Sequence, residues 1–175
     1  MRSLCRAQRL TERRCADGKR RRAMRRKDRE ITDRRVIDAI IRECRVCRLG
    51  LCDEGEPYVV PMCFGYDGSA VYFHAALEGR KLDIIRRSDR VCLEWDILRE
   101  LSEMQPPCRW KTVYQSVIAW GRAEILSTLP EKRRGLDILL SHYGAVGRAL
   151  PDEAVERTCV IRVVIDRISG KQSAG

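Results

Sequence analysis

The chain has 175 residues and a formal net charge of +10. A length of this order supports one domain with a hydrophobic core and argues against two. No apolar run approaches the ~20 residues that span a bilayer. The N-terminal charges also lack the apolar stretch of a secretory signal. We therefore expect a cytoplasmic protein without membrane contact.

The charge excess lies at the N-terminus. Residues 1–27 hold 12 of the 35 Lys and Arg but only two acids, which leaves 23 basic and 23 acidic residues afterwards. Such a block has too few large apolar residues to fold. We predict a disordered basic tail over 1–27, a domain over 28–170 and a flexible C-terminus over 171–175. The tail is either a nucleic-acid or membrane arm or, the preferred interpretation, an over-long start preceding Met24.

Cysteine spacing gives little support to a metal site. Cys44 and Cys47 have the spacing of half a zinc site, but no second pair completes it. We predict no metal. Cys63, Cys92 and Cys159 lie in apolar strand patterns, where reduced thiols fill a core. A redox role for the cysteines remains the alternative.

Residues 32–44 predict the first helix. Thr32 or Asp33 can cap it, and apolar residues recur at helical spacing until about Cys44. Three apolar runs then predict strands in a meander, with a tight turn at Asp67-Gly68. These runs cover residues 46–52, 57–67 and 70–76.

The second half alternates helices with longer strands. Gly121 inside the long run marks a bulge or a close backbone approach, and Pro130 suits the first turn of a helix. The expected elements are a short helix from Gly79, a strand over 90–97, one bent strand or two over 112–128, a helix from Pro130 towards Tyr143, and a strand over 159–168. Short connections favour an antiparallel sheet. About six strands, with peripheral helices, would close into a barrel of the mainly β (α+β) class.

One polar constellation, Tyr-Phe-His-Ala-Ala-Leu-Glu-Gly-Arg-Lys over residues 72–81, runs from a strand into a helix start. Unpaired N–H groups at a helix N-terminus, with His74, Arg80 and Lys81 near it, would suit a phosphate. A solvated basic turn is the plainer interpretation, and a lone histidine at a strand end commonly packs locally.

Residues 57–61 form a stiff segment in which Val59 and Val60 stand between two prolines. Such a segment can offer backbone groups to a planar ring at fixed points. It equally suits an edge strand whose prolines discourage aggregation. The two interpretations are compatible.

Taken together, the order of motifs resembles a known family. These motifs are Pro-Tyr-Val-Val-Pro-Met, Val-Tyr-Phe-His-Ala-Ala with Gly-Arg-Lys, Val-Cys-Leu-Glu-Trp-Asp, and Ser-Val-Ile-Ala-Trp-Gly-Arg-Ala. Over residues 26 to about 171 the chain resembles the 5-nitroimidazole-resistance branch of the pyridoxamine 5′-phosphate oxidase-like FMN-binding proteins. The resemblance implies a split β-barrel and a homodimer with FMN at the subunit interface.

The resemblance also assigns site residues. The isoalloxazine ring would lie along Val59, Val60, Pro61 and Met62, with backbone groups of Val60 and Met62 at its polar edge. The phosphate would be held by His74, Ala75, Arg80 and Lys81. From the other subunit, Trp120 and Gly121 would approach the flavin.

FMN would carry the electron chemistry, so no catalytic triad is expected, and the sequence offers none. His74 is the candidate catalytic residue. The resemblance implies an oxidoreductase that reduces a small nitroaromatic or quinone-like compound. The alternatives are a non-catalytic module binding flavin, deazaflavin F420 or haem, and a nucleic-acid-binding protein acting through the basic tail.

Overall fold

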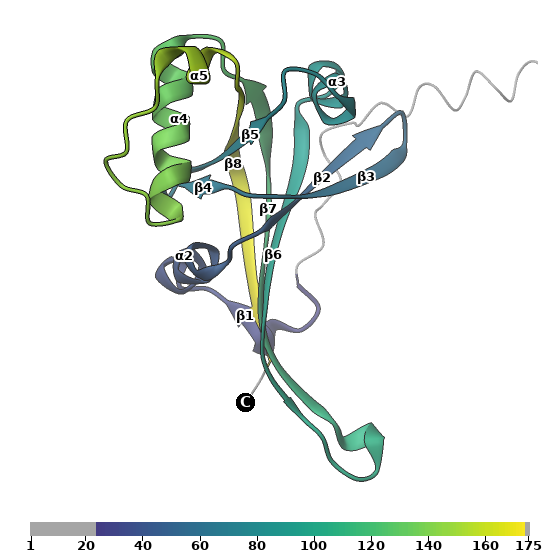
Figure 1. Cartoon of the computed structure of the whole chain (residues 1–175). Coiled ribbons are helices and arrows are strands. Elements are labelled where there is room, and N and C mark those ends of the chain that lie inside the picture. The colour runs from purple at the N-terminus through teal and green to yellow at the C-terminus, as the bar shows by residue number, and fades with distance from the viewer. Residues whose placement is uncertain (1–23, 174–175) are drawn as a thin grey trace, which may run out of the picture.

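The computed structural model describes residues 24–173, so most of the predicted basic tail lies outside the described residues. Mostly antiparallel strands with a few helices make up the fold (Figure 1), which confirms the predicted mainly β split barrel. The strands are β1 Glu30–Ile31, β2 Cys47–Asp53, β3 Glu56–Met62, β4 Gly65–Tyr66, β5 Ala70–Ala75, β6 Arg90–Ser102, β7 Lys111–Ile125 and β8 Cys159–Gln172. The helices are η1 Lys27–Arg29, α2 Arg34–Glu43, α3 Arg80–Arg87, η2 Pro107–Arg109, α4 Leu129–His142 and α5 Asp152–Glu156.

One sheet runs in the order β3-β2-β6-β7-β8-β5-β4, with β1 paired to β8. It has eight strands rather than about six, because the run 57–67 divides into β3 and β4 and the short β1 was not foreseen. Strand β8 continues past residue 170, where Lys171 pairs with Glu30. Within the described residues, no helix is long and apolar enough to cross a membrane.

The predicted three-strand meander is wrong, although the expected tight turn at Asp67-Gly68 does join β4 to β5. β2 and β3 form a hairpin, but β5 pairs with β4 and β8 and lies towards the opposite end of the sheet from β3. Pro57 and Pro61 lack the N–H group that a second neighbouring strand would need, which suits β3 to an edge.

The helix boundaries follow local capping signals. Asp33 caps α2 by accepting a hydrogen bond from the Arg35 N–H (2.8 Å). Thr128 and Glu131 form a capping box at the start of α4. Gly79 precedes α3 with φ 129° and provides no side-chain cap. These outcomes confirm the three helices expected from the sequence.

The main core lies inside the curled sheet around the fully buried Trp95 and Phe64, whose ring centroids are 5.7 Å apart. A second cluster, which includes Tyr72 and Leu136, fills the space between α4 and the β5–β8 part of the sheet. Figure 1 shows α4 and α5 covering that part, and the β6–β7 hairpin extending beyond the body as an arm.

Candidate functional site

The turn from β5 into α3 carries the predicted phosphate-binding residues. His74 is exposed near the end of β5, while Ala75 is half-buried and packs against the main core. Their side chains therefore point to opposite faces of the strand, as successive residues of a strand do. Helix α3 begins at Arg80 without a side-chain cap. Its first backbone N–H groups are thus available to a ligand.

Positive charge gathers near the end of β5. Ala75 pairs with Cys159 of β8. Burial raises the pKa of the Cys159 thiol, and the nearby charges of Lys132, Arg86 and Lys81 oppose that rise. The half-buried Lys81, in the first turn of α3, adds to the positive charge at this end of β5.

Arg80 points towards β3. Its guanidinium donates to the Glu56 carboxylate (2.8 Å) and lies 4.9 Å from the centroid of the Tyr58 ring. This exposed ion pair contributes little stability and can exchange for another anion. Arg80 thus connects the predicted phosphate turn to the predicted ring segment, a contact that sequence spacing alone did not reveal.

The register of β3 determines which backbone groups reach its free edge. Pro57 pairs with Cys52, and Pro61 with Arg48. Prolines fit only the pairs that exchange no hydrogen bonds, and such pairs alternate with bonded ones in antiparallel strands. Val59 lies two residues from each proline and is 61% exposed, so its pair with β2 also exchanges no hydrogen bonds. Its N–H and C=O therefore point to the free edge of β3. The backbone groups of Val60 and Met62 face β2 by the same alternation.

Trp120 lies on the outer face of the sheet, away from the β5–α3 turn. A row of paired residues crosses five strands from β3 to β8: Val59, Gly50, Cys92, Trp120 and Arg167. With strands about 4.8 Å apart, Trp120 lies roughly 14 Å from Val59 in the same chain. The Arg167 guanidinium lies 3.5 Å from the centroid of the Trp120 ring, a cation–π contact.

Gly121 is required for the packing of β7 against β8 within its own chain. The register shifts between Trp120 and Gly121, which confirms the predicted irregularity. A Cβ at Gly121 would lie 2.1 Å from the Val164 carbonyl oxygen of β8. The absence of a side chain therefore permits the close approach of β7 and β8 at this bulge.

Trp120 and Gly121 both line a cavity of about 320 Å³ on this outer face. The volume is at the lower end of the range for small-molecule sites. Sequence reasoning missed the neighbouring Gly50, Cys52 and Cys92, which also line it. Their alternation within strands was visible, but the β2–β6 pairing that brings them together was not.

The cysteine predictions have mixed outcomes. Cys159 is buried as expected, but Cys63 is exposed between β3 and β4, so its expected role in the core is wrong. Cys92 is half-buried because it faces outward. Burial raises the pKa of Cys44 to about 11 and that of Cys47 well above the usual thiol value. Among the described residues, no three His, Cys, Asp or Glu side chains gather as a metal site.

The curled antiparallel sheet, its proline-bearing edge and the β5–α3 turn define a split-barrel protein. The family model described as pyridoxamine 5′-phosphate oxidase matches residues 33–172. The chain therefore belongs to the pyridoxamine 5′-phosphate oxidase family.

Among solved structures, a proposed 5-nitroimidazole antibiotic resistance protein of Bacteroides thetaiotaomicron is 33% identical, with a TM-score of 0.75. The match covers 82% of this chain and 86% of that one, and it supports the 5-nitroimidazole-resistance branch.

More distant structures share the fold. The flavocytochrome Anf3 of Azotobacter vinelandii is 23% identical, with a TM-score of 0.75 over 90% of this chain and 75% of that one. An FAD- and haem-binding protein of Mycobacterium smegmatis is 21% identical, with the same TM-score over 84% of this chain and 74% of that one.

A curated Rhizobium meliloti relative, the uncharacterized protein RA0666, is 25% identical over 96 residues. That match spans 55% of this chain and only 56% of the relative.

Proposed function

We propose that the protein binds FMN across the interface of a homodimer and uses it to reduce a small nitroaromatic or quinone-like compound. The observation that carries the proposal is the β5–α3 turn, where an uncapped helix start lies beside Lys81. The family match and the similarity to a proposed nitroimidazole resistance protein support it. An FAD- and haem-binding protein and an FAD-binding protein of the same fold support a redox cofactor in general.

In this proposal the phosphate of FMN occupies the β5–α3 turn. The α3 N–H groups and Lys81 provide donors, and Arg80 can exchange Glu56 for the phosphate. His74 and Ala75 lie at the β5 end of the same turn. The flavin ring then extends along β3, where the N–H and C=O of Val59 point to the free edge.

The outer face of the sheet supports pairing of two copies. Val59, Ile118, Val164 and Leu98 project from this face as exposed apolar side chains. Two copies packed here would cover them, which favours association. The roughly 14 Å between Trp120 and Val59 of one chain is consistent with the partner's Trp120 completing the ring site.

FMN supplies the electron chemistry when it is bound. The chain binds the phosphate, fixes the ring against the edge of β3 and, through the apolar face, limits water. His74 is the candidate for moving a proton to the reduced substrate, because the two ring nitrogens of an imidazole can donate and accept hydrogen bonds. The other histidine, His142, forms a hydrogen bond with the Cys44 carbonyl (2.8 Å) and packs at a tilt against the Phe64 ring.

Absorbance spectra of the purified protein, before and after incubation with FMN and desalting, test the cofactor. We expect a flavin spectrum that remains with the protein, followed by NAD(P)H oxidation when a nitroaromatic acceptor is added. A colourless protein after reconstitution would exclude FMN, and a haem or deazaflavin spectrum would identify the alternative cofactor. A retained flavin without turnover of any acceptor would favour a non-catalytic module.

A further inference from the structure

A cavity of about 830 Å³ lies between α2, the β4–β5 hairpin and α4. Its volume falls within the range of small-molecule sites. None of the residues assigned to flavin lines it. Arg42 of α2, Tyr66 and Asp67 of the hairpin, and one face of α4 form its walls.

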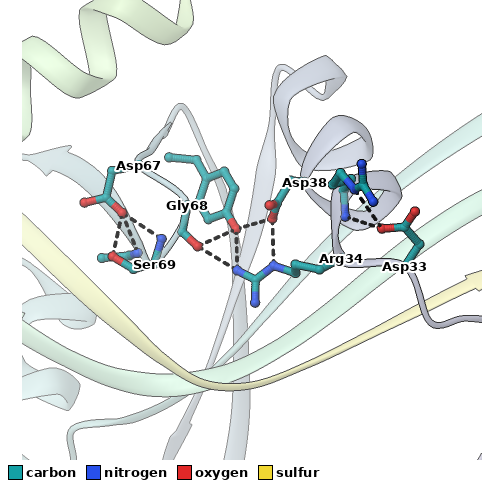
Figure 2. Close-up of polar contacts among 9 residues, drawn as sticks. Asp33, Arg34, Asp38, Asp67, Gly68 and Ser69 are labelled. Atoms are coloured by element: carbon teal, nitrogen blue, oxygen red, sulfur yellow. Dashed lines mark hydrogen bonds and ion pairs between the residues drawn. The ribbon is translucent and has the colours of Figure 1, made fainter.

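The Tyr66 wall is held by a polar network. The Tyr66 hydroxyl donates to Asp38 (2.6 Å) and accepts from Arg34 (2.8 Å). Figure 2 shows Arg34 joining Asp38 of α2 to the Gly68 carbonyl of the hairpin (2.6 Å). Burial, with the Asp38 hydrogen bond, raises the pKa of Tyr66 to about 12. The wall is therefore neutral and fixed before any ligand arrives.

Two of the charged groups in the lining are already satisfied. One Asp67 oxygen accepts from the Ser69 N–H (2.8 Å), the Ser69 hydroxyl (2.9 Å) and the Ala70 N–H (2.8 Å), and the other accepts from Tyr72 (3.0 Å). Arg133 donates to the Leu150 carbonyl (2.8 Å) and to Asp152. Asp152 therefore neutralises Arg133, whereas Asp67 keeps its negative charge but has both oxygens occupied by neutral donors.

The remaining side chains include two guanidinium donors that suit an anion. Arg42 and Arg134 form no ion pair with any residue that the structure describes, and Asp137 likewise has no cationic partner there. Arg42 lies over the Tyr66 ring, 5.5 Å from its centroid. Arg42 and Arg134 balance Asp67 and Asp137 in formal charge, so the preference for an anion rests on the donors of these two guanidinium groups, which bind carboxylates and phosphates well.

The same cavity offers apolar surface. Pro130, Arg134 and Ile138 recur at intervals of four residues and share one face of α4. Pro130 and Ile138 therefore flank Arg134, opposite the Tyr66 side. A ligand with an anionic head and an apolar body matches this lining.

We infer that this cavity is a second binding site, separate from the proposed flavin site, for a small organic anion that carries a carboxylate or a phosphate on an apolar body. The inference does not depend on the proposed function. Arg42 and Arg134 bind the anionic head, and Tyr66, Pro130 and Ile138 contact the body.

Calorimetric titration with 1-naphthyl phosphate, 1-naphthoate and neutral 1-naphthamide tests the site. We expect one-to-one binding of the anions, with the stronger anion identifying the preferred head group, and much weaker binding of the amide. Binding of the amide as strongly as both anions would overturn the inference.

Charge variants locate the binding. Arg42→Gln and Arg134→Gln should each weaken anion binding by roughly threefold to tenfold, as expected for a partly exposed charge-assisted hydrogen bond. Asp137→Asn should strengthen it, because it removes a repulsive carboxylate. Arg35→Gln is the matched control, since the Arg35 side chain is 95% exposed and lies outside the cavity lining.

These substitutions change exposed side chains, so circular dichroism should show folded proteins. Unchanged affinity in both arginine variants would overturn the inference. Displacement of the bound anion by FMN would also overturn it, because the anion would then occupy the flavin site.

Discussion

Replacing Gly121 with alanine should destabilise the protein strongly, because the new Cβ would lie 2.1 Å from the Val164 carbonyl oxygen. Both groups belong to the backbone frame of paired strands, so β7 and β8 must separate by about 1 Å. Overpacking of this kind costs about 1–3 kcal/mol. A weakened ladder hydrogen bond adds about 1 kcal/mol. We therefore expect a loss of about 2–4 kcal/mol.

Gly50→Ala is the matched control. Gly50 lines the same cavity, but its Cβ would lie 3.2 Å from the Cys92 carbonyl oxygen, a contact that a small shift relieves. Thermal and urea unfolding at one fixed protein concentration should show Gly121→Ala with a Tm lower by roughly 5–12 °C. Equal stability of the two variants would refute the reasoning, since the demand for glycine at residue 121 would then arise outside the β7–β8 contact.

Three further outcomes follow from the structure. Lys81→Ala should weaken FMN retention by about 1–3 kcal/mol, as for a lost charge-assisted hydrogen bond, whereas Lys111→Ala on the distant arm should not. Equilibrium dialysis measures both, and equal affinities would remove the phosphate assignment. Thr128→Ala breaks the α4 capping box and should cost about 1 kcal/mol in urea unfolding. Burial raises the pKa of Glu94, despite the opposing hydrogen bond from Arg48. The protonated form of Glu94 therefore stabilises the fold at low pH, and this contribution is lost as the pH rises. Glu94→Gln should gain stability relative to the native protein as the pH rises above the ordinary glutamate value of 4.5, and a difference independent of pH would contradict this.

The sequence predicted elements best where the signal was local. The start of α2 was predicted from Thr32 or Asp33 and that of α4 from Pro130, signals that span only a few residues. Thr128, which caps α4, had been assigned to the preceding strand. Gly121 was recognised as a backbone irregularity because glycine within a long strand has few other uses. These signals hold whatever the rest of the chain does.

Long-range pairing was less predictable. Whether β5 joins β3 or β8 depends on a strand that follows about 90 residues later, and apolar alternation is the same in both cases. Cys63 was misplaced for a related reason. The single run 57–67 breaks before the buried Phe64, which packs on Trp95, so that Cys63 is left exposed.

The two candidate sites show the same contrast between local and long-range signals. His74, Ala75, Arg80 and Lys81 share the β5–α3 turn because they are consecutive or nearly so, whereas the Arg80–Glu56 contact depends on the fold. The cavity of Arg42, Tyr66 and Arg134 draws on segments separated by many residues, and no motif marks it. Neighbours in the sequence therefore revealed one candidate site but not the other.

The distribution of charge bears on the class of ligand. The formal excess of +10 falls within residues 1–27, and the rest of the chain is balanced. In the described part, many arginines are matched with nearby acids, as in Arg87 with Asp53 (2.6 Å) and Arg48 with Glu94 (2.9 Å). Such pairing cancels the long-range field that steers a polyanion to a surface. At a cavity, in contrast, the field acts over a few ångströms, and individual unpaired cations suffice to attract a small anion. The folded domain is therefore better suited to small anions at Lys81 or between Arg42 and Arg134 than to a nucleic-acid strand, whose binding would depend on the basic N-terminal segment.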